Sequence, residues 1–191
     1  MNAIKHATTA YPVLDIIRKR WSPRSFSEKD ISEHDMNTIL EAATWSFSAL
    51  NEQPWRFLVA HRGTERFNNL LDILYPGNKP WNKQAAALVL TFRKKTVGKD
   101  GQLNPNGLHD VGAANMLLSL QANSMGIYTH LMEGFDKAVA AELVTPSIEE
   151  LEPVVLIALG YPADASRLEE PYKSRELAPR KRKTLAEVII Q

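Results

Sequence analysis

Two apolar runs, Ala85 to Phe92 and Pro153 to Leu159, constrain most strongly how this chain can fold. Each run is short and bounded by turn residues, a pattern that is typical of buried strands. Between them, Leu108 to Met125 carries apolar and small side chains at helical spacing, and Gly126 ends that pattern. The sequence therefore predicts a buried sheet and one long, central helix.

Shorter patterns predict the remaining elements. Ser32 and Asp35 have the spacing of a capping box, which begins a helix expected from Ile31 to Trp45. Residues 93–107, with three Gly, one Pro and several Lys, indicate a mobile surface loop. About four strands and five or six helices in mixed order predict an α+β sheet covered by helices. The further expected elements are a short helix after Pro12, a strand over Trp55 to Ala60, and helices over Thr64 to Leu74 and Gly134 to Val144.

The length of the chain allows one packed core. It has 191 residues, 44% of them hydrophobic, with no internal repeat and no linker, so residues 1–191 are expected to form a single domain. Residues 163–191 are charged and poor in core residues until Leu185 to Ile190. We therefore expect residues 163–191 to form an extended tail that wraps a partner.

Composition excludes several functional classes. The chain has no Cys, which removes disulfides, iron–sulfur clusters, Cys-based zinc sites and thiol catalysis. Its formal net charge is +1, so no global field favours nucleic acid or a membrane surface as a partner. The first ten residues are polar and no apolar run approaches the ~20 residues of a membrane span, which favours a cytoplasmic location. The motifs of Rossmann dehydrogenases, P-loop NTPases, zincins and α/β-hydrolases are absent from the sequence.

Four polar segments are candidates for a binding site. The first offers guanidinium groups suited to phosphate, the second offers amides and hydroxyls that can contact a heteroaromatic ring, and the third offers backbone N–H groups at a helix start. Taken singly, the first and fourth segments are more often a solvated basic loop and a solvated charge run, the second is more often a capped loop with a core Trp, and the third says little. The five His residues show no metal-ligand spacing, and His109-Asp110 is interpreted as a polar cluster at a helix start rather than an acid–base pair. The segments, in order, are Arg20 to Phe26, Ser46 to Trp55, Met132 to Asp136 and Arg180 to Lys183.

Together, in this order and at these separations, the four segments resemble the nitroreductase family, and the match covers nearly the whole chain. The first segment is similar to the family's R-R-S-x-R-x-F motif, with Trp21 in place of Arg or His. The second is similar to its P-S-x-x-N-x-Q-P-W motif, with Phe47 in place of Pro. The residues from Glu133 to Asp136 resemble an E-G-F-D turn, and Asn78 begins an N-x-x-W element.

This resemblance implies the family's fold, a mainly antiparallel sheet of four to five strands covered by helices, and non-covalently bound FMN. It also implies a homodimer in which each subunit exchanges its C-terminal tail with its partner. The residues that the resemblance places around FMN are Arg20, Trp21, Ser22, Arg24, Phe47, Ser48, Ala49, Asn51, Asn78, Glu133, Gly134, Arg180 and Arg182.

The roles that the resemblance implies differ between segments. Arg20 and Ser22, with the two arginines of the tail, would hold the phosphate, and Arg24 would lie beside N1 and O2 of the isoalloxazine ring. Asn78 would bond the polar ring edge or the ribityl chain, and the backbone of residues 133–134 would face N5 and O4. The candidate residues of the second segment would reach the FMN of the opposite subunit.

A protein of this kind is expected to move two electrons from NAD(P)H through FMN to a small planar acceptor, such as a nitroaromatic or a quinone, by a ping-pong mechanism. No side chain acts as a nucleophile and no metal takes part, while Arg24 tunes the flavin by stabilising negative charge at N1. Two alternatives stay open: a flavin-binding module without turnover, and a specialised branch of the same fold such as a dehalogenase or a flavin-cleaving enzyme. A nucleic-acid-binding tail over Lys173 to Lys183 is disfavoured by the net charge of +1.

Overall fold

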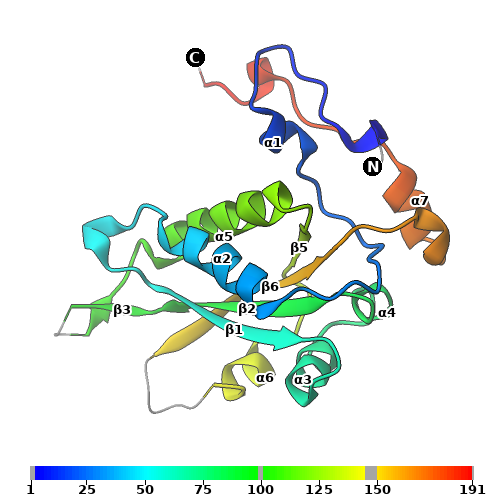
Figure 1. Cartoon of the computed structure of the whole chain (residues 1–191). Helices are drawn as coiled ribbons and strands as arrows, with labels where there is room; N and C mark the ends of the chain where they lie inside the picture. Colours follow the sequence, from blue (N-terminus) through cyan, green and yellow to red (C-terminus); the bar gives the residue numbers. More distant parts are fainter. Residues whose placement is uncertain (1–2, 99–100, 145–149, 191) are drawn as a thin grey trace.

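The computed structural model describes residues 3–98, 101–144 and 150–190. At its centre is a four-stranded antiparallel sheet with the strand order β1-β2-β6-β5 (Figure 1). The strands are β1 (Trp55–His61), β2 (Ala87–Lys94), β5 (Tyr128–Met132) and β6 (Leu151–Gly160). The expected α+β class and the antiparallel sheet are confirmed.

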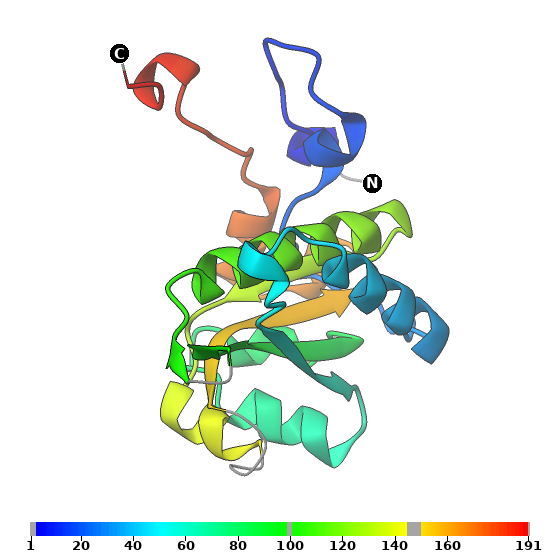
Figure 2. The ribbon, with the colours of Figure 1, turned by 90° about the vertical axis from the view of Figure 1, so that its left-hand side faces the viewer.

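Helices cover both faces of this sheet, so the body of the molecule has three layers (Figure 1, Figure 2). One face carries α2 (Glu33–Thr44) and α5 (Gly107–Ser124). The opposite face carries α3 (Glu65–Asp72), α4 (Lys79–Asn82) and α6 (Lys137–Glu142). None of the helices in the described part of the chain is long and apolar enough to span a membrane.

The two apolar runs form the central strands β2 and β6. Val89 lies opposite Ile157 and Leu90 lies opposite Leu156, and all four side chains are fully buried. Because side chains alternate along a strand, Val89 and Ile157 pack with α2 and α5, whereas Leu90 and Leu156 pack with α3 and α6. Helices on both faces require apolar residues at successive positions, which explains why the runs are uninterrupted.

Local hydrogen bonds begin the helices near the predicted residues. The Ser32 hydroxyl accepts from the backbone N–H of Asp35 at 3.0 Å, which begins α2. The Thr64 hydroxyl accepts from the Phe67 N–H at 3.2 Å, which begins α3. Such caps satisfy N–H groups that have no partner inside the helix. The predictions for α2, α3 and α5 are confirmed to within two residues at each end.

Residues 93–107 are more regular than the sequence predicted. β2 continues to Lys94, and a small hairpin follows, formed by β3 (Thr96–Val97) and β4 (Gln102–Leu103). Gly98 and Gly101 flank its turn with φ values of +62° and +64°. These left-handed conformations are cheap for glycine, and the two residues stand directly after β3 and directly before β4. Residues 99–100 of the predicted loop lie outside the described residues.

Both ends of the chain stand apart from the three layers (Figure 2). The N-terminal segment contains η1 (Ala3–Lys5) and α1 (Asp15–Lys19), so this helix begins later than the expected start after Pro12. The C-terminal segment contains η3 (Ala165–Arg167), α7 (Tyr172–Leu177) and η4 (Leu185–Glu187). α7 packs on its own chain through a buried glutamate, so the first part of the expected extended tail is folded. Residues 181–190 are exposed.

Candidate functional site

Three arginines from the two ends of the chain lie near one another. Arg20 follows α1, and Arg180 and Arg182 lie in the tail; we call these three residues the arginine cluster. Burial lowers the pKa of Arg20, and the charges of Arg180 and Arg182 lower it further. Among the described residues, no acidic side chain forms an ion pair with any member of the cluster. The cluster is therefore a patch of uncompensated positive charge that suits an anion.

Arg24 lies in the loop that continues from Arg20. Its side chain is partly buried, and its Cζ lies 5.8 Å from the centre of the Trp81 ring in α4. Burial lowers the pKa of Arg24, although the nearby Glu176 carboxylate opposes this shift. A guanidinium held over an aromatic face keeps a fixed position and exerts a strong local field, because little water screens it.

Trp21 packs inside the protein, next to the partly buried Ser22. Its side chain is 9% exposed and meets Tyr128 edge-on, with the ring centres 6.3 Å apart. Trp21 and Tyr128 line a cavity of about 630 Å³ together with Glu176 and Leu177 of α7. The aromatic residue at this position of the motif therefore faces a cavity bordered by α7.

His130 of β5 links the sheet to the loop of Arg20 to Phe26. Its Nδ1 lies 2.9 Å from the Pro23 carbonyl oxygen, and its ring centre is 4.5 Å from that of Trp81. Burial, with a further contribution from the Arg24 charge, lowers the pKa of His130 to about 4. The imidazole is therefore neutral at pH 7, and its Nδ1–H donates to the Pro23 carbonyl.

Asn78 and Gly134 contact each other where α4 meets the turn after β5. The Asn78 side-chain amide donates to the Gly134 carbonyl at 3.2 Å. A Cβ on Gly134 would lie 2.7 Å from the Asn78 Nδ2, so a side chain here would displace the Asn78 amide from its present position. Glu133 lines a cavity of about 580 Å³ with Leu108 and Gly112 of α5. The turn thus lies between α4 and a cavity at the beginning of α5.

Asp110 in the first turn of α5 anchors the polar loop that precedes β1. Its carboxylate accepts from the Ser48 hydroxyl at 3.2 Å and from the Ala49 N–H at 3.0 Å, and it lies 3.0 Å from Nδ1 of His109. Burial opposes ionisation of Asp110, but these hydrogen bonds together hold its pKa below the usual value. The interpretation of His109-Asp110 as a polar cluster at a helix start is confirmed.

The same loop is strained and exposed. Leu50 and Asn51 lie in η2 (Ala49–Asn51) with φ values of +53° and +57°, a conformation that costs energy for residues with a Cβ. Phe47 is 67% exposed and Leu50 is 92% exposed. Figure 1 shows this loop at the beginning of α5, whereas the tail lies toward the other end of that helix. Within one chain, the structure brings the arginines together and joins Asn78 to Gly134, but it leaves Phe47, Ser48, Ala49 and Asn51 apart from the arginine cluster.

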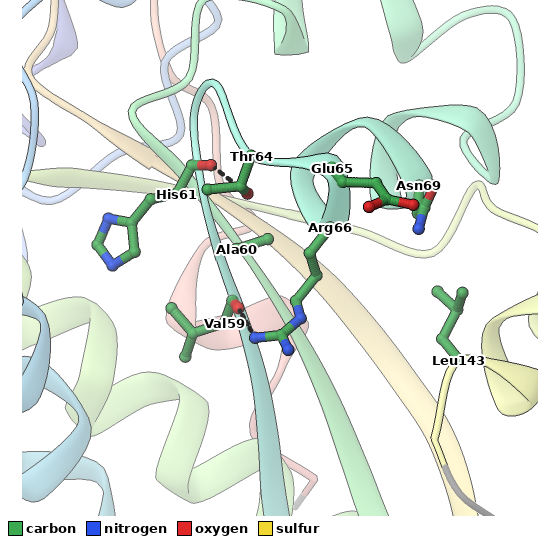
Figure 3. A pocket seen from close by; sticks show the side chains of 8 residues that line it. All are labelled: Val59, Ala60, His61, Thr64, Glu65, Arg66, Asn69 and Leu143. Atoms are coloured by element: carbon green, nitrogen blue, oxygen red, sulfur yellow. Dashed lines mark hydrogen bonds between the residues drawn. The ribbon is translucent and has the colours of Figure 1, made fainter.

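Another cavity, of about 550 Å³, lies beside the edge strand β1 and contains none of the candidate residues (Figure 3). Two of its polar side chains bond to the β1 backbone: Arg66 Nη1 donates to the Val59 carbonyl at 3.3 Å, and the Thr64 hydroxyl donates to the His61 carbonyl at 2.7 Å. Because this cavity contains none of the candidate residues, we place the candidate site around the arginine cluster. The described residues contain no group of His, Asp and Glu side chains that could hold a metal ion.

Three polar residues that fix the candidate loops were not identified as site residues from the sequence: Asp110, His130 and Glu176. Asp110 gave a local signal, because it lies beside His109 at a helix start. His130 and Glu176 gave none, since each acts on a loop more than a hundred positions earlier in the chain. Long-range pairs of this kind need a structure, or an alignment of many relatives, to be found.

Comparisons with known proteins identify the family of the chain. The family model described as the Nitroreductase family matches residues 17–161. A crystal structure of an oxidoreductase containing FMN is similar with a TM-score of 0.89 and 33% identity, and the match covers 96% of this chain and 93% of that one. The major NAD(P)H-flavin oxidoreductase of Aliivibrio fischeri is 22% identical over 219 residues, covering 94% of this chain and 98% of that protein. Iodotyrosine deiodinase of Thermotoga neapolitana is 28% identical over 174 residues, covering 78% and 88%, respectively.

The family match extends from the middle of α1 to the residue after β6 and so includes the four-stranded sheet, α2, α5 and the loop of Arg20 to Phe26. The similar FMN-containing structure extends the agreement over nearly the full length of the chain. The chain belongs to the nitroreductase family.

Proposed function

We propose that the chain is an FMN-dependent oxidoreductase that moves two electrons from NAD(P)H to a small planar acceptor, such as a nitroaromatic or a quinone. The observation that carries this proposal is the arginine cluster, which has no acidic partner among the described residues and continues into the loop of Arg24. Guanidinium groups in such a cluster suit a phosphate ester. The 33% identical oxidoreductase that contains FMN supports a flavin phosphate as that ester.

The residues around the cluster fit the other parts of FMN. The arginine cluster and Ser22 would hold the phosphate, and Arg24 would lie at the N1 and O2 edge of the ring. Asn78 would contact the polar ring edge or the ribityl chain. The backbone of Glu133 and Gly134 would face N5 and O4.

When bound, FMN supplies the redox chemistry by accepting a hydride equivalent from NAD(P)H and passing two electrons to the acceptor. The residues of the chain bind the flavin, orient it and tune its reduction. Arg24 stabilises the negative charge that reduction places on the ring, and its partial burial strengthens this effect. Trp81 contacts both Arg24 and His130, so the guanidinium is supported by two aromatic rings in series.

An absorption spectrum tests the proposal together with the role of Arg24. The purified protein should show the two visible bands of a flavin, and anaerobic NADH or NADPH should bleach them. In Arg24→Ala the flavin should be reduced roughly 10- to 100-fold more slowly, because a charged contact to the ring is lost. Stopped-flow absorbance measures this rate, with Arg66→Ala, an arginine of the cavity in Figure 3, as the control.

Three outcomes separate the possibilities. A protein that stays colourless after incubation with FMN would contradict the proposal, and an unchanged reduction rate in Arg24→Ala would contradict the place of that residue. A bound flavin that neither NADH nor NADPH reduces would indicate a binding module without turnover. A dehalogenase is the second candidate because of the 28% identical deiodinase, and halide release from a halogenated phenol would support it over the general reductase.

We also propose that residues 1–191 form one domain that acts as a homodimer in which the tails are exchanged. The loop of Phe47 to Asn51 lies apart from the arginine cluster of its own chain, so it would contact FMN across the dimer. The tail offers apolar side chains for a partner, since Val188 is 57% exposed and Ile189 is 59% exposed. β1 is an edge strand, so a second chain could pair with it where its carbonyls are not already bonded by Arg66 and Thr64.

Sedimentation should therefore give a mass of twice the 21.5 kDa of one chain. The double variant Val188→Asp and Ile189→Asp should weaken the dimer by roughly 100-fold or more, because two carboxylates would be buried at the interface, and it should lose FMN as well. Lys183→Gln, a polar change in the same exposed segment, is the matched control. A wild-type monomer that holds FMN would contradict the dimer proposal and leave the flavin proposal intact.

A further inference from the structure

Glu176 is a buried carboxylate that the proposed chemistry does not use. It lies in α7 and is 2% exposed. Its two oxygens accept from the backbone N–H of Arg24 at 3.1 and 3.0 Å, and one of them also accepts from the Ser25 N–H at 3.1 Å. Two successive N–H groups of the loop thus point at one carboxylate from the far end of the chain.

Further contacts tie the same two regions together. The Lys5 ammonium donates to the backbone carbonyls of Arg175 and Ala178, which lie at and just after the end of α7. In return, the Arg180 guanidinium donates to the carbonyls of Lys5 at 3.1 Å and Arg18 at 2.9 Å. The N-terminal segment, the loop and the tail are therefore joined by reciprocal hydrogen bonds on both sides of Glu176.

The charge of Glu176 has a clear electrostatic use here. Positive groups from three segments lie in this region, and their mutual repulsion opposes the assembly of the arginine cluster. Burial raises the pKa of the Glu176 carboxyl, while the N–H groups of Ser25 and Arg24 and the charges of Arg24 and Lys5 oppose that shift. A carboxylate at this point accepts from the loop, and its charge offsets the repulsion that Lys5 experiences from Arg24 and Arg180, which no neutral side chain does in the same way.

We propose that Glu176 is a positioning residue that assembles the phosphate-binding half of the site, by fixing the loop of Arg20 to Ser25 against the tail that carries Arg180 and Arg182. This inference rests on the proposed binding of FMN. It predicts a specific defect when the carboxylate is removed: the ring contact of Arg24, which FMN and riboflavin share, weakens for both ligands, and the site in addition loses its advantage for a phosphorylated flavin.

The test compares FMN with riboflavin, which has the same ring and no phosphate. Both ligands are titrated by fluorescence into flavin-stripped, full-length wild type, Glu176→Gln and Glu169→Gln. Glu169 is the matched control, because it is an exposed glutamate seven positions earlier in the same tail. In Glu176→Gln the Kd for FMN should rise roughly 10- to 100-fold, and the Kd for riboflavin should rise less, so that the ratio of the two Kd values moves toward one. Glu169→Gln should match the wild type for both ligands.

The outcomes distinguish this inference from the proposed function. If the wild type binds neither flavin, the proposed function is contradicted and the inference with it. If the wild type prefers FMN and Glu176→Gln keeps the same ratio of the two Kd values, the inference alone is overturned, since a general loss of stability would weaken both ligands equally. Should Glu176→Gln fail to fold, Glu176→Asp decides: it keeps the charge but has a shorter reach, so an unchanged ratio overturns the inference and a reduced ratio supports it.

Discussion

Replacing Gly160 with alanine should lower the free energy of unfolding by about 2 kcal/mol, because overpacking of a rigid core typically costs this much. A Cβ at this last residue of β6 would lie 2.7 Å from Cδ1 and 3.0 Å from Cγ of Phe26. The Phe26 ring is fully buried, and its backbone pairs with Pro162, so neither side can move freely. Urea denaturation measures the difference from the wild type.

Two further variants make this prediction specific. Gly112→Ala places a Cβ in α5 where no heavy atom lies within 4 Å, and it should leave stability unchanged or raise it by up to about 1 kcal/mol through helix propensity. In a Phe26→Ala background, which lacks both Cγ and Cδ1, Gly160→Ala should cost less than it does in the wild-type background. Equal unfolding free energies for Gly160→Ala and the wild type would show that the strand and the ring can separate.

Acidification should destabilise the protein through His130, by about 3 kcal/mol at most. The pKa of His130 is lowered from 6.5 in the unfolded chain to about 4 in the fold. Above pH 6.5 the imidazole is neutral in both states, so its contribution to stability is complete. As the pH falls from 6.5 toward 4, the unfolded chain binds a proton that the folded chain excludes, and the unfolding free energy decreases through this window.

His130→Gln isolates this contribution, because the amide can still donate toward the Pro23 carbonyl and does not titrate. Urea denaturation at pH 7 and at pH 4.5 should show a smaller decline for His130→Gln than for the wild type. His34→Gln, a change at an exposed position of α2, should decline as the wild type does. A decline in His130→Gln equal to that of the wild type would mean that acid sensitivity arises from other groups.

The sequence predicted the body of the fold because its signals are local. The runs that became β2 and β6 are apolar at successive positions, and the helical spacing of α5 continues until Gly126 ends it. The hairpin of β3 and β4 escaped prediction, since its two-residue strands are too short to show a period. α7 also escaped, because it is a six-residue helix with one buried side chain in a charged segment.

The candidate site was predictable only as a list of residues. The motif around Arg20 and the basic run at Arg180 are visible in the sequence, but only a resemblance connects them. The contacts that hold the loop depend on groups 107 positions away, between Pro23 and His130, and 152 positions away, between Arg24 and Glu176. Both contacts form because the folded chain buries these groups against one another. Contacts between groups so far apart in the sequence depend on the whole fold, so the residues next to them in the sequence do not reveal them.

The reciprocal bonds between the two chain ends also set an order of events during biosynthesis. The ribosome releases the N-terminus first, so the carbonyls of Lys5 and Arg18 exist long before the Arg180 guanidinium that pairs with them. The last strand of the four-stranded sheet ends at Gly160, so all four strands are synthesised before the tail that carries Arg180 and Arg182. The arginine cluster can therefore form only after the residues of the sheet and its two layers of helices have been made.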